Sequence, residues 1–286
     1  MIHFRPIDAE FIFMLAAVIV FFVYSYALLR RKKLAGKRDA AMYLLVVITF
    51  AVIGARIWGF ADRPDIFSRQ FFLDFVNPMH ADMQSMGVIA GVFAGVLIST
   101  FVFRPKKAHY QYELARFFDV LVVPGALALF IARLGCLLDG HILGKPSALP
   151  WAIQYPGEAF GRHPAAAYLS LSALLIFAVL KFFFDHKKTS KTRLGKRFDG
   201  EIAVWFVSIY CFNRFWIEFF VQGHHGGTDP RYLGLLGVQW VCLVTSVLFL
   251  FHLMPMYILY KFEKRKAFGY PPLSLIKYLS RKDQAD

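Results

Sequence analysis

The sequence predicts an all-α, polytopic membrane protein with seven transmembrane helices, its amino terminus outside and its carboxy terminus in the cytoplasm. Of its 286 residues 58% are hydrophobic and the mean hydropathy is positive, yet the formal net charge is +14. Apolar and charged residues must therefore be segregated along the chain. Stretches long and apolar enough to cross a bilayer lie at about 9–29, 40–61, 83–103, 117–139, 164–184, 202–222 and 232–260.

The first of these stretches is expected to remain as a transmembrane helix. At about 20 residues it is too long for a signal-peptide core, only Arg5 precedes it as a basic residue, and no small-residue cleavage pattern follows. The whole chain, 1–286, is predicted to be one transmembrane domain that ends in a basic cytoplasmic tail, 261–286.

The basic residues fix the predicted orientation, because Lys and Arg beside membrane spans are retained in the cytoplasm. Of the 33 Lys and Arg residues, 24 lie in four segments, 30–38, 104–116, 181–198 and the tail. All four segments fall on one side of the membrane if seven spans alternate. The high net charge is thus mainly a feature of topology, and no nucleic-acid partner is expected.

Three arginines are predicted to share the outer half of the membrane. Arg133 lies within IARLGCLLDGHILG, about 12 Å below the outer end of its helix at about 1.5 Å per residue. Arg214 lies at about the same depth and Arg56 about 8 Å down. Glu218 follows Arg214 by one helical turn and can pair with it, and Tyr210 precedes Arg214 by one turn.

Charges at such a depth are costly unless they face a partner or a polar cavity, so they are candidates for function. The alternative is that each arginine bridges helices or extends its side chain to the surface. The planar guanidinium fork suits phosphate, and a net positive cavity in one leaflet indicates an anionic lipid head group.

No metal or cofactor is expected. Cys136, Cys211 and Cys242 fall within predicted spans without metal-ligand spacing, and we expect them to be reduced and buried. His224 and His225 are adjacent but have no third ligand in the sequence, and the neighbouring glycines favour a loop.

Several motifs together resemble one family, the prolipoprotein diacylglyceryl transferases of bacterial cytoplasmic membranes. They occur in that family's order and topological positions across nearly the whole chain. The motifs are GAR at 54–56, ARLGCLLDGHILG at 132–144, PWAIQYP at 150–156, RHPAAAY at 162–168, YCFNRFWIEFF at 210–220 and GVQW at 237–240.

The resemblance implies transfer of the diacylglyceryl group from phosphatidylglycerol to the lipobox cysteine of a prolipoprotein, with release of glycerol phosphate. It implies that Arg133 binds the phospholipid and is required for activity, and that Arg214 and Glu218 belong to the catalytic site. Further lipid contacts are expected from Arg56, Tyr210 and His163. The expected partners are phosphatidylglycerol, or a similar anionic phospholipid, and the prolipoprotein signal peptide.

The chain also departs from the family pattern. Met86 stands where members usually carry a histidine that aids catalysis, and Cys136 and Asp139 replace two asparagines. His141 replaces a glutamate and is the best substitute base that the sequence offers, although a solvated loop histidine is an equal alternative. The tryptophan–tyrosine–glycine pattern of the first span has no clear counterpart in AEFIFMLAAV.

Two functional hypotheses follow. The first is an active diacylglyceryl transferase, favoured by the retained Arg133, Arg214 and Glu218. The second is a catalytically weakened homologue that binds phospholipid or lipoprotein as a subunit of a larger membrane assembly, favoured by Met86. A transporter is less consistent with the sequence, which has no matching pair of broken half-helices.

Overall fold

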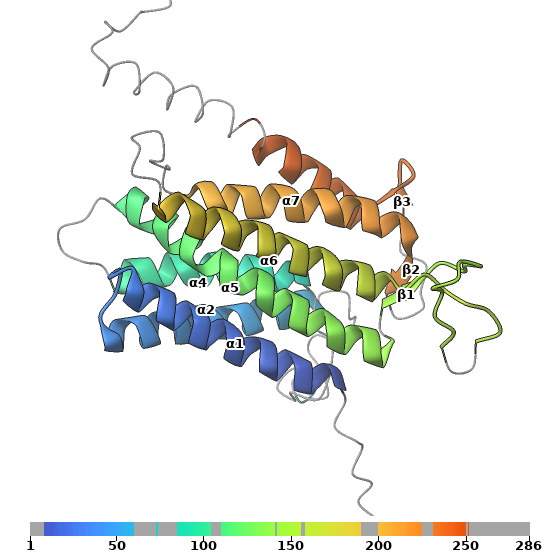
Figure 1. Cartoon of the computed structure of the whole chain (residues 1–286), viewed down its shortest axis with the longest axis horizontal. Coiled ribbons are helices and arrows are strands. Elements are labelled where there is room, and N and C mark those ends of the chain that lie inside the picture. Colours follow the sequence, from blue (N-terminus) through green and yellow to red (C-terminus); the bar gives the residue numbers. More distant parts are fainter. Residues whose placement is uncertain are drawn as a thin grey trace, which may run out of the picture.

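A computed structural model gives the fold and describes residues 9–59, 73, 85–103, 110–140, 142–155, 158–189, 200–224, 231–249 and 251. Its labelled helices are α1 (Ala9–Arg31), α2 (Lys37–Gly59), α4 (Ser85–Val102), α5 (Tyr110–Asp139), α6 (Ala165–Thr189) and α7 (Glu201–Ile217). A further apolar helix, Gly237–Phe249, follows them. The helices lie side by side along the long axis of the molecule (Figure 1).

Short strands gather at one end of this bundle. Strand β1 (Ile142–Gly144) follows α5, and β2 (Val221–His224) follows α7 and the 3-10 helix η2 (Glu218–Phe220). The two strands pair antiparallel, with Ile142 opposite His224. They join the carboxy-terminal ends of α5 and α7 at what we call the strand end of the bundle (Figure 1). Strands β3 (Arg231–Tyr232) and β4 (Leu235–Leu236) form a second small antiparallel pair.

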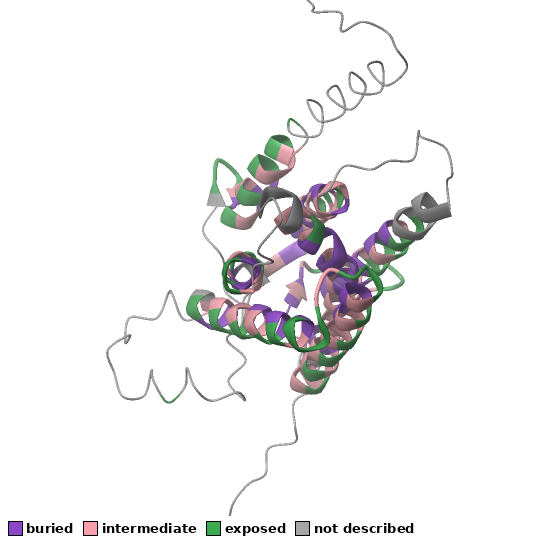
Figure 2. Ribbon diagram, turned by 90° about the vertical axis from the view of Figure 1, so that its left-hand side faces the viewer, coloured by how far each residue is buried: buried purple, intermediate pink, exposed green. Residues whose placement is uncertain are grey.

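The helices have the length and composition of membrane spans. Among the described residues, five helices are long and apolar enough to cross a bilayer, and two more, Gly87–Val102 and Gly237–Phe249, are apolar but shorter. On α1 the exposed side chains Ile12, Leu15, Ile19 and Val23 are all apolar and between 52% and 59% exposed. Burial is confined to the faces that helices turn toward one another (Figure 2). The chain is therefore a multi-pass membrane protein, and its apolar helices fit the seven expected spans.

Several element boundaries differ from the predicted ones. Helix α5 begins at Tyr110 rather than near residue 117, because the polar segment before the apolar run consists largely of good helix formers. Helix α7 ends at Ile217, and the chain becomes extended at Val221 instead of continuing as a helix to residue 222. The predicted tail, 261–286, lies outside the described residues.

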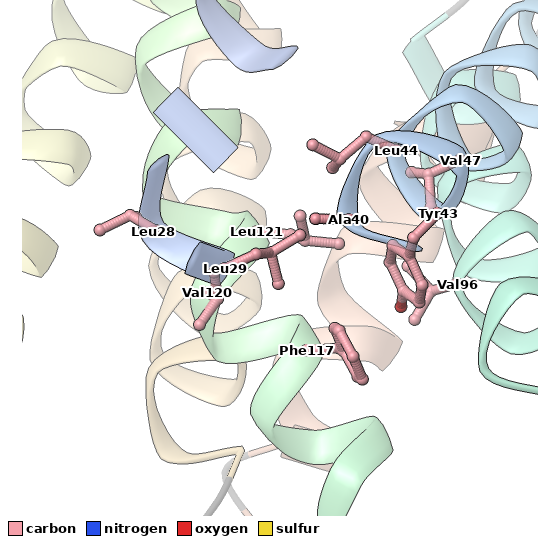
Figure 3. Close-up of a cluster of buried hydrophobic side chains, with 10 residues drawn as sticks. All are labelled: Leu28, Leu29, Ala40, Tyr43, Leu44, Val47, Val96, Phe117, Val120 and Leu121. Atoms are coloured by element: carbon pink, nitrogen blue, oxygen red, sulfur yellow. The ribbon is translucent and has the colours of Figure 1, made fainter. Parts of the chain in front are cut away.

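The largest buried cluster lies toward the end of the bundle opposite the strands. It draws on α1, α2, α4 and α5, and the rings of Tyr43 and Phe117 stack at its centre with 4.4 Å between centroids. The Tyr43 hydroxyl lies 3.4 Å from the hydroxyl of Thr100 on α4. The cluster consists of Leu28, Leu29, Ala40, Tyr43, Leu44, Val47, Val96, Phe117, Val120 and Leu121 (Figure 3).

Glycines bring α2 and α4 into backbone contact. A Cβ atom on Gly91 would lie 2.1 Å from the carbonyl oxygen of Phe50, and one on Gly54 would lie 2.4 Å from the carbonyl oxygen of Gly87. One turn further along α4, a Cβ on Gly95 would lie 2.8 Å from the Cα of Val47. Small residues spaced four apart are the usual means by which helices pack closely in lipid.

A carboxylate on α5 fixes the start of α7. Asp119 accepts hydrogen bonds from the backbone N–H groups of Gly200 and Ala203, both at 2.9 Å. Gly200 precedes α7 with a φ of 93°, a left-handed conformation that suits glycine. Since the first N–H groups of a helix have no partner within it, Asp119 acts as a cap from a neighbouring helix. This cap fixes the position of α7 along the axis of α5. Arg133 lies on α5 and Arg214 lies on α7.

Candidate functional site

Arg133 lies on α5 near the strand end, where α1 and α7 pack beside it. Its Nη1 donates to Cys136 Sγ at 3.9 Å, and Cys136 Sγ in turn donates to Glu10 Oε1 at 3.4 Å. Glu10 is the second residue of α1. The structure thus joins a guanidinium, a thiol and a carboxylate in one contiguous chain of contacts across two helices.

A glycine allows α1 to approach α5 at this point. A Cβ atom on Gly135 would lie 2.8 Å from Glu10 Cα and 2.9 Å from Phe13 Cβ, so no larger residue fits without displacing α1. The glycine of the ARLGC motif therefore places Glu10 against Cys136. This is a steric reason for the motif, independent of any lipid.

Tyr210 approaches the same guanidinium from α7. Its hydroxyl interacts electrostatically with Arg133. The phenol ring stacks on Phe206, one turn earlier on α7, with 5.9 Å between centroids. The structure therefore brings together Arg133 and Tyr210, two of the residues predicted to bind lipid, from helices that are distant in the sequence.

Arg214 and Glu218 form a buried ion pair, with Arg214 Nη2 2.8 Å from Glu218 Oε2. Their side chains are 5% and 1% exposed. Cys242 of the last described helix interacts electrostatically with both charges and with Cys211. The pairing predicted from the spacing is confirmed, and so is the burial of all three cysteines as free thiols.

Arg56 is buried in the last turn of α2, with only 4% of its surface exposed. Because α2, α5 and α7 all end at the strand end, Arg56, Arg133 and Arg214 lie toward one end of the bundle (Figure 1). The expectation that three helices place their arginines at one end is confirmed.

Arg162 lies among the loops and strands at the strand end of the bundle. Its Nη2 lies 2.9 and 3.0 Å from the two carboxylate oxygens of Glu158, and its Nη1 donates to the Gly144 carbonyl at 3.1 Å and to Gln222. The guanidinium also lies 4.8 Å from the centroid of the Phe160 ring. Arg162 therefore fastens the loop before α6 to both β1 and β2.

His163, predicted to contact lipid, lies in an aromatic cluster at the strand end. Its Nδ1 is 3.3 Å from the Tyr168 hydroxyl, which accepts a hydrogen bond from Trp151 Nε1 at 2.9 Å. The His163 ring lies 5.0 Å from the Phe220 ring. The cluster connects α6 to η2 rather than to the Arg133 network.

Tyr155 packs beside the turn that follows α5. Gly140 has a φ of 68°, and a Cβ atom there would lie 3.2 Å from the Tyr155 ring. Burial raises the pKa of the Tyr155 hydroxyl, and the charge of Arg162 opposes that shift. The PWAIQYP motif thus supplies a ring that covers this turn.

The GVQW motif has a structural role. Gln239 is completely buried, accepts a hydrogen bond from Leu236 N at 2.9 Å and donates to the Phe215 carbonyl at 3.3 Å. Trp240 Nε1 donates to the Tyr232 carbonyl at 2.9 Å. These bonds fasten the last described helix to α7 behind Arg214.

For three of the predicted residues, the structure does not describe the side chain. His141 lies outside the described residues, and Met86 and Asp139 are placed within α4 and α5 by their backbone alone. Glu10 was missed, because its contact with Cys136 spans 126 positions in the sequence. The available hint was an acidic residue at the start of an otherwise apolar helix.

Comparison with known proteins agrees with these motifs. The pattern of the family described as prolipoprotein diacylglyceryl transferase matches residues 9–255. The chain belongs to this family.

Three relatives bear the name phosphatidylglycerol–prolipoprotein diacylglyceryl transferase. That of Aliarcobacter butzleri is 27% identical over 176 residues, which cover 61% of this chain and 57% of the relative. That of Bordetella avium is 27% identical over 232 residues, covering 78% and 80%. That of Sinorhizobium medicae is 30% identical over 155 residues, covering 54% and 50%. In this member of the diacylglyceryl transferase family, Arg133 and Tyr210 are the first residues whose role should be tested by substitution.

Proposed function

We propose that this chain transfers the diacylglyceryl group of phosphatidylglycerol to the lipobox cysteine thiol of prolipoproteins. It would act in the bacterial cytoplasmic membrane, with the strand end of the bundle facing outward. The observation that carries the proposal is the arrangement at Arg133, where a guanidinium oriented by Tyr210 and Cys136 lies within a membrane-spanning helix.

The chemistry explains why the arginine is needed. When the glyceryl carbon bonds to sulfur, the phosphate is the leaving group and gains negative charge. A positioned cation stabilises such charge more strongly in a dry site than in water. Arg133 is suited to hold the phosphate, and the planar fork allows two hydrogen bonds to it.

Arg214 supports this site in a different way. Its charge is balanced by Glu218 at 2.8 Å, so the pair adds no net charge and keeps α7 in a fixed arrangement beside Arg133. Arg56 adds a third guanidinium at the same end of the bundle. His163 lies in the aromatic cluster with Tyr168 and Phe220 at the strand end.

A direct assay tests the proposal. Purified protein in phosphatidylglycerol vesicles is mixed with a synthetic lipobox peptide, and glycerol phosphate release is followed with the mass of the peptide. We expect both signals, and we expect neither from a peptide in which serine replaces the cysteine. Arg133→Ala abolishes both if the arginine holds the phosphate.

The second candidate is a homologue that binds phospholipid without turnover, and the observation that favours it is Met86 in place of the family histidine. It predicts phosphatidylglycerol binding that depends on Arg133, with no peptide modification by the wild type or by Met86→His. That combined result would replace the enzyme with the binding protein.

A further inference from the structure

We propose that Glu10 is the general base that accepts the proton of the acceptor thiol. The inference rests on the proposed function and deepens it by naming the group that activates the nucleophile. The carboxylate of Glu10 would perform this step in a chain that carries Met86 where the resemblance to the family leads us to expect a histidine.

The contacts at Cys136 show the required geometry. A thiol there lies 3.4 Å from Glu10 Oε1 and 3.9 Å from Arg133 Nη1. Glu10 therefore already accepts a hydrogen bond from one thiol at this site. An acceptor thiol must meet the same two requirements, a base within hydrogen-bond reach and a phosphate-bound carbon next to the arginine.

The backbone holds Glu10 where the step requires it. Gly135 of α5 allows the Glu10 Cα to lie against it, where an added Cβ would come within 2.8 Å. Glu10 also lies in the first turn of α1. The amino-terminal end of a helix attracts negative charge, which suits a carboxylate at this position.

Among the described residues, the charged and titratable groups near this carboxylate include Cys136 and Arg133 of α5, with Tyr210 of α7 beyond Arg133. The positive charge of Arg133 is separated from the carboxylate by the Cys136 thiol. It is close enough to stabilise the phosphate that leaves. The same chain of contacts would therefore serve both the removal of the thiol proton and the stabilisation of the leaving phosphate.

The step balances without a further reagent. The S–H proton of the acceptor cysteine passes to a Glu10 oxygen, and the thiolate sulfur attacks the glyceryl carbon that carries the phosphate ester. The C–S bond forms as the C–O bond breaks, and the electron pair remains on the oxygen of glycerol phosphate beside Arg133. Glu10 then releases its proton to water.

The test is a pH profile of turnover with phosphatidylglycerol vesicles and the lipobox peptide. A free thiol with a pKa near about 8.5 is roughly 3% ionised at pH 7, so Glu10→Gln should lower the rate about 30-fold there. The deficit should shrink about tenfold per pH unit and vanish near the thiol pKa. Phosphatidylglycerol binding should be unchanged.

Two further variants sharpen the result. Glu10→His supplies a base with a pKa near about 6.5, so its rate should rise through that value instead of through the thiol pKa. Glu201→Gln, in the first turn of α7 at the opposite end of the bundle, removes a carboxylate of the same kind and should leave rate and profile unchanged. Thermal unfolding of each variant checks that it is folded.

Other outcomes overturn the proposal in distinguishable ways. If Glu10→Gln reduces the rate equally at every pH, or if Glu10→His shows no inflection near 6.5, Glu10 only holds α1 in place. If Glu10→Gln turns over like the wild type, Glu10 has no part in the step. If the wild type gives no turnover at any pH, the proposed function itself is wrong and Glu10 has no thiol to activate.

Discussion

Arg214 and Glu218 form an ion pair 2.8 Å long in which both side chains are almost fully buried. Burying two charges is costly, and their attraction offsets the cost only while both are present. The pair follows from a spacing of four residues on α7 and the turn after it. The ion pair therefore fixes the conformation of the chain where α7 ends.

Glu218→Gln should destabilise the protein severely, because it leaves the Arg214 charge buried without its partner. We expect a loss of about 3–5 kcal/mol, the range seen when one member of a buried pair is removed. Thermal unfolding in detergent measures it. The double variant Arg214→Met with Glu218→Leu removes both charges and should be more stable than Glu218→Gln. A single variant as stable as the wild type contradicts the assignment.

Arg133→Lys should weaken retention of phosphatidylglycerol and abolish turnover, because lysine keeps the charge but loses the planar fork. Co-purified lipid, measured by mass spectrometry, and the peptide assay provide the two readings. Lys181→Arg on α6 is the matched control for exchange of one cation for another. Unchanged binding and turnover would make Arg133 a residue that only bridges α5 and α7.

Asp119→Ala should lower stability by about 1–2 kcal/mol, because the backbone N–H groups at the start of α7 lose their acceptor. Asp119→Asn retains one acceptor oxygen and should lose less. Unfolding temperature gives the order of the three proteins. An alanine variant as stable as wild type would show that water caps α7 equally well.

The orientation predicted from the basic segments is tested by fused reporters. A reporter after Lys196 should be cytoplasmic, and one inserted at Lys145 should be external. The reverse result would place Arg133 and Arg56 in the other leaflet. The proposed site would then face the wrong side for an exported substrate.

Apolar stretches of sufficient length were enough to predict the helices, because bilayer thickness constrains every span in the same way. The Arg214–Glu218 pair was equally accessible, since helix geometry alone relates residues four apart. The extended segment after α7 was not, because a short apolar run such as FFV at 219–221 has the same composition whether it is a helix or a strand.

The Glu10–Cys136 contact marks the limit of sequence reasoning. Its two residues come from α1 and α5, and only the packing of these helices at Gly135 brings them together. The family motif identified Cys136 as a departure without indicating what it touches. A replacement in one helix becomes interpretable only when the neighbouring helix is known.

The contact between α2 and α4 has a consequence for how this sequence can change. At Gly54 and Gly91 the space for a single methyl group is already occupied by backbone of the opposite helix. Exchanges among aliphatic residues on the exposed faces alter only what touches lipid, whereas alanine at either glycine must push two helices apart. In a library of random variants, the most intolerant positions outside the site should therefore be the smallest residues in the protein.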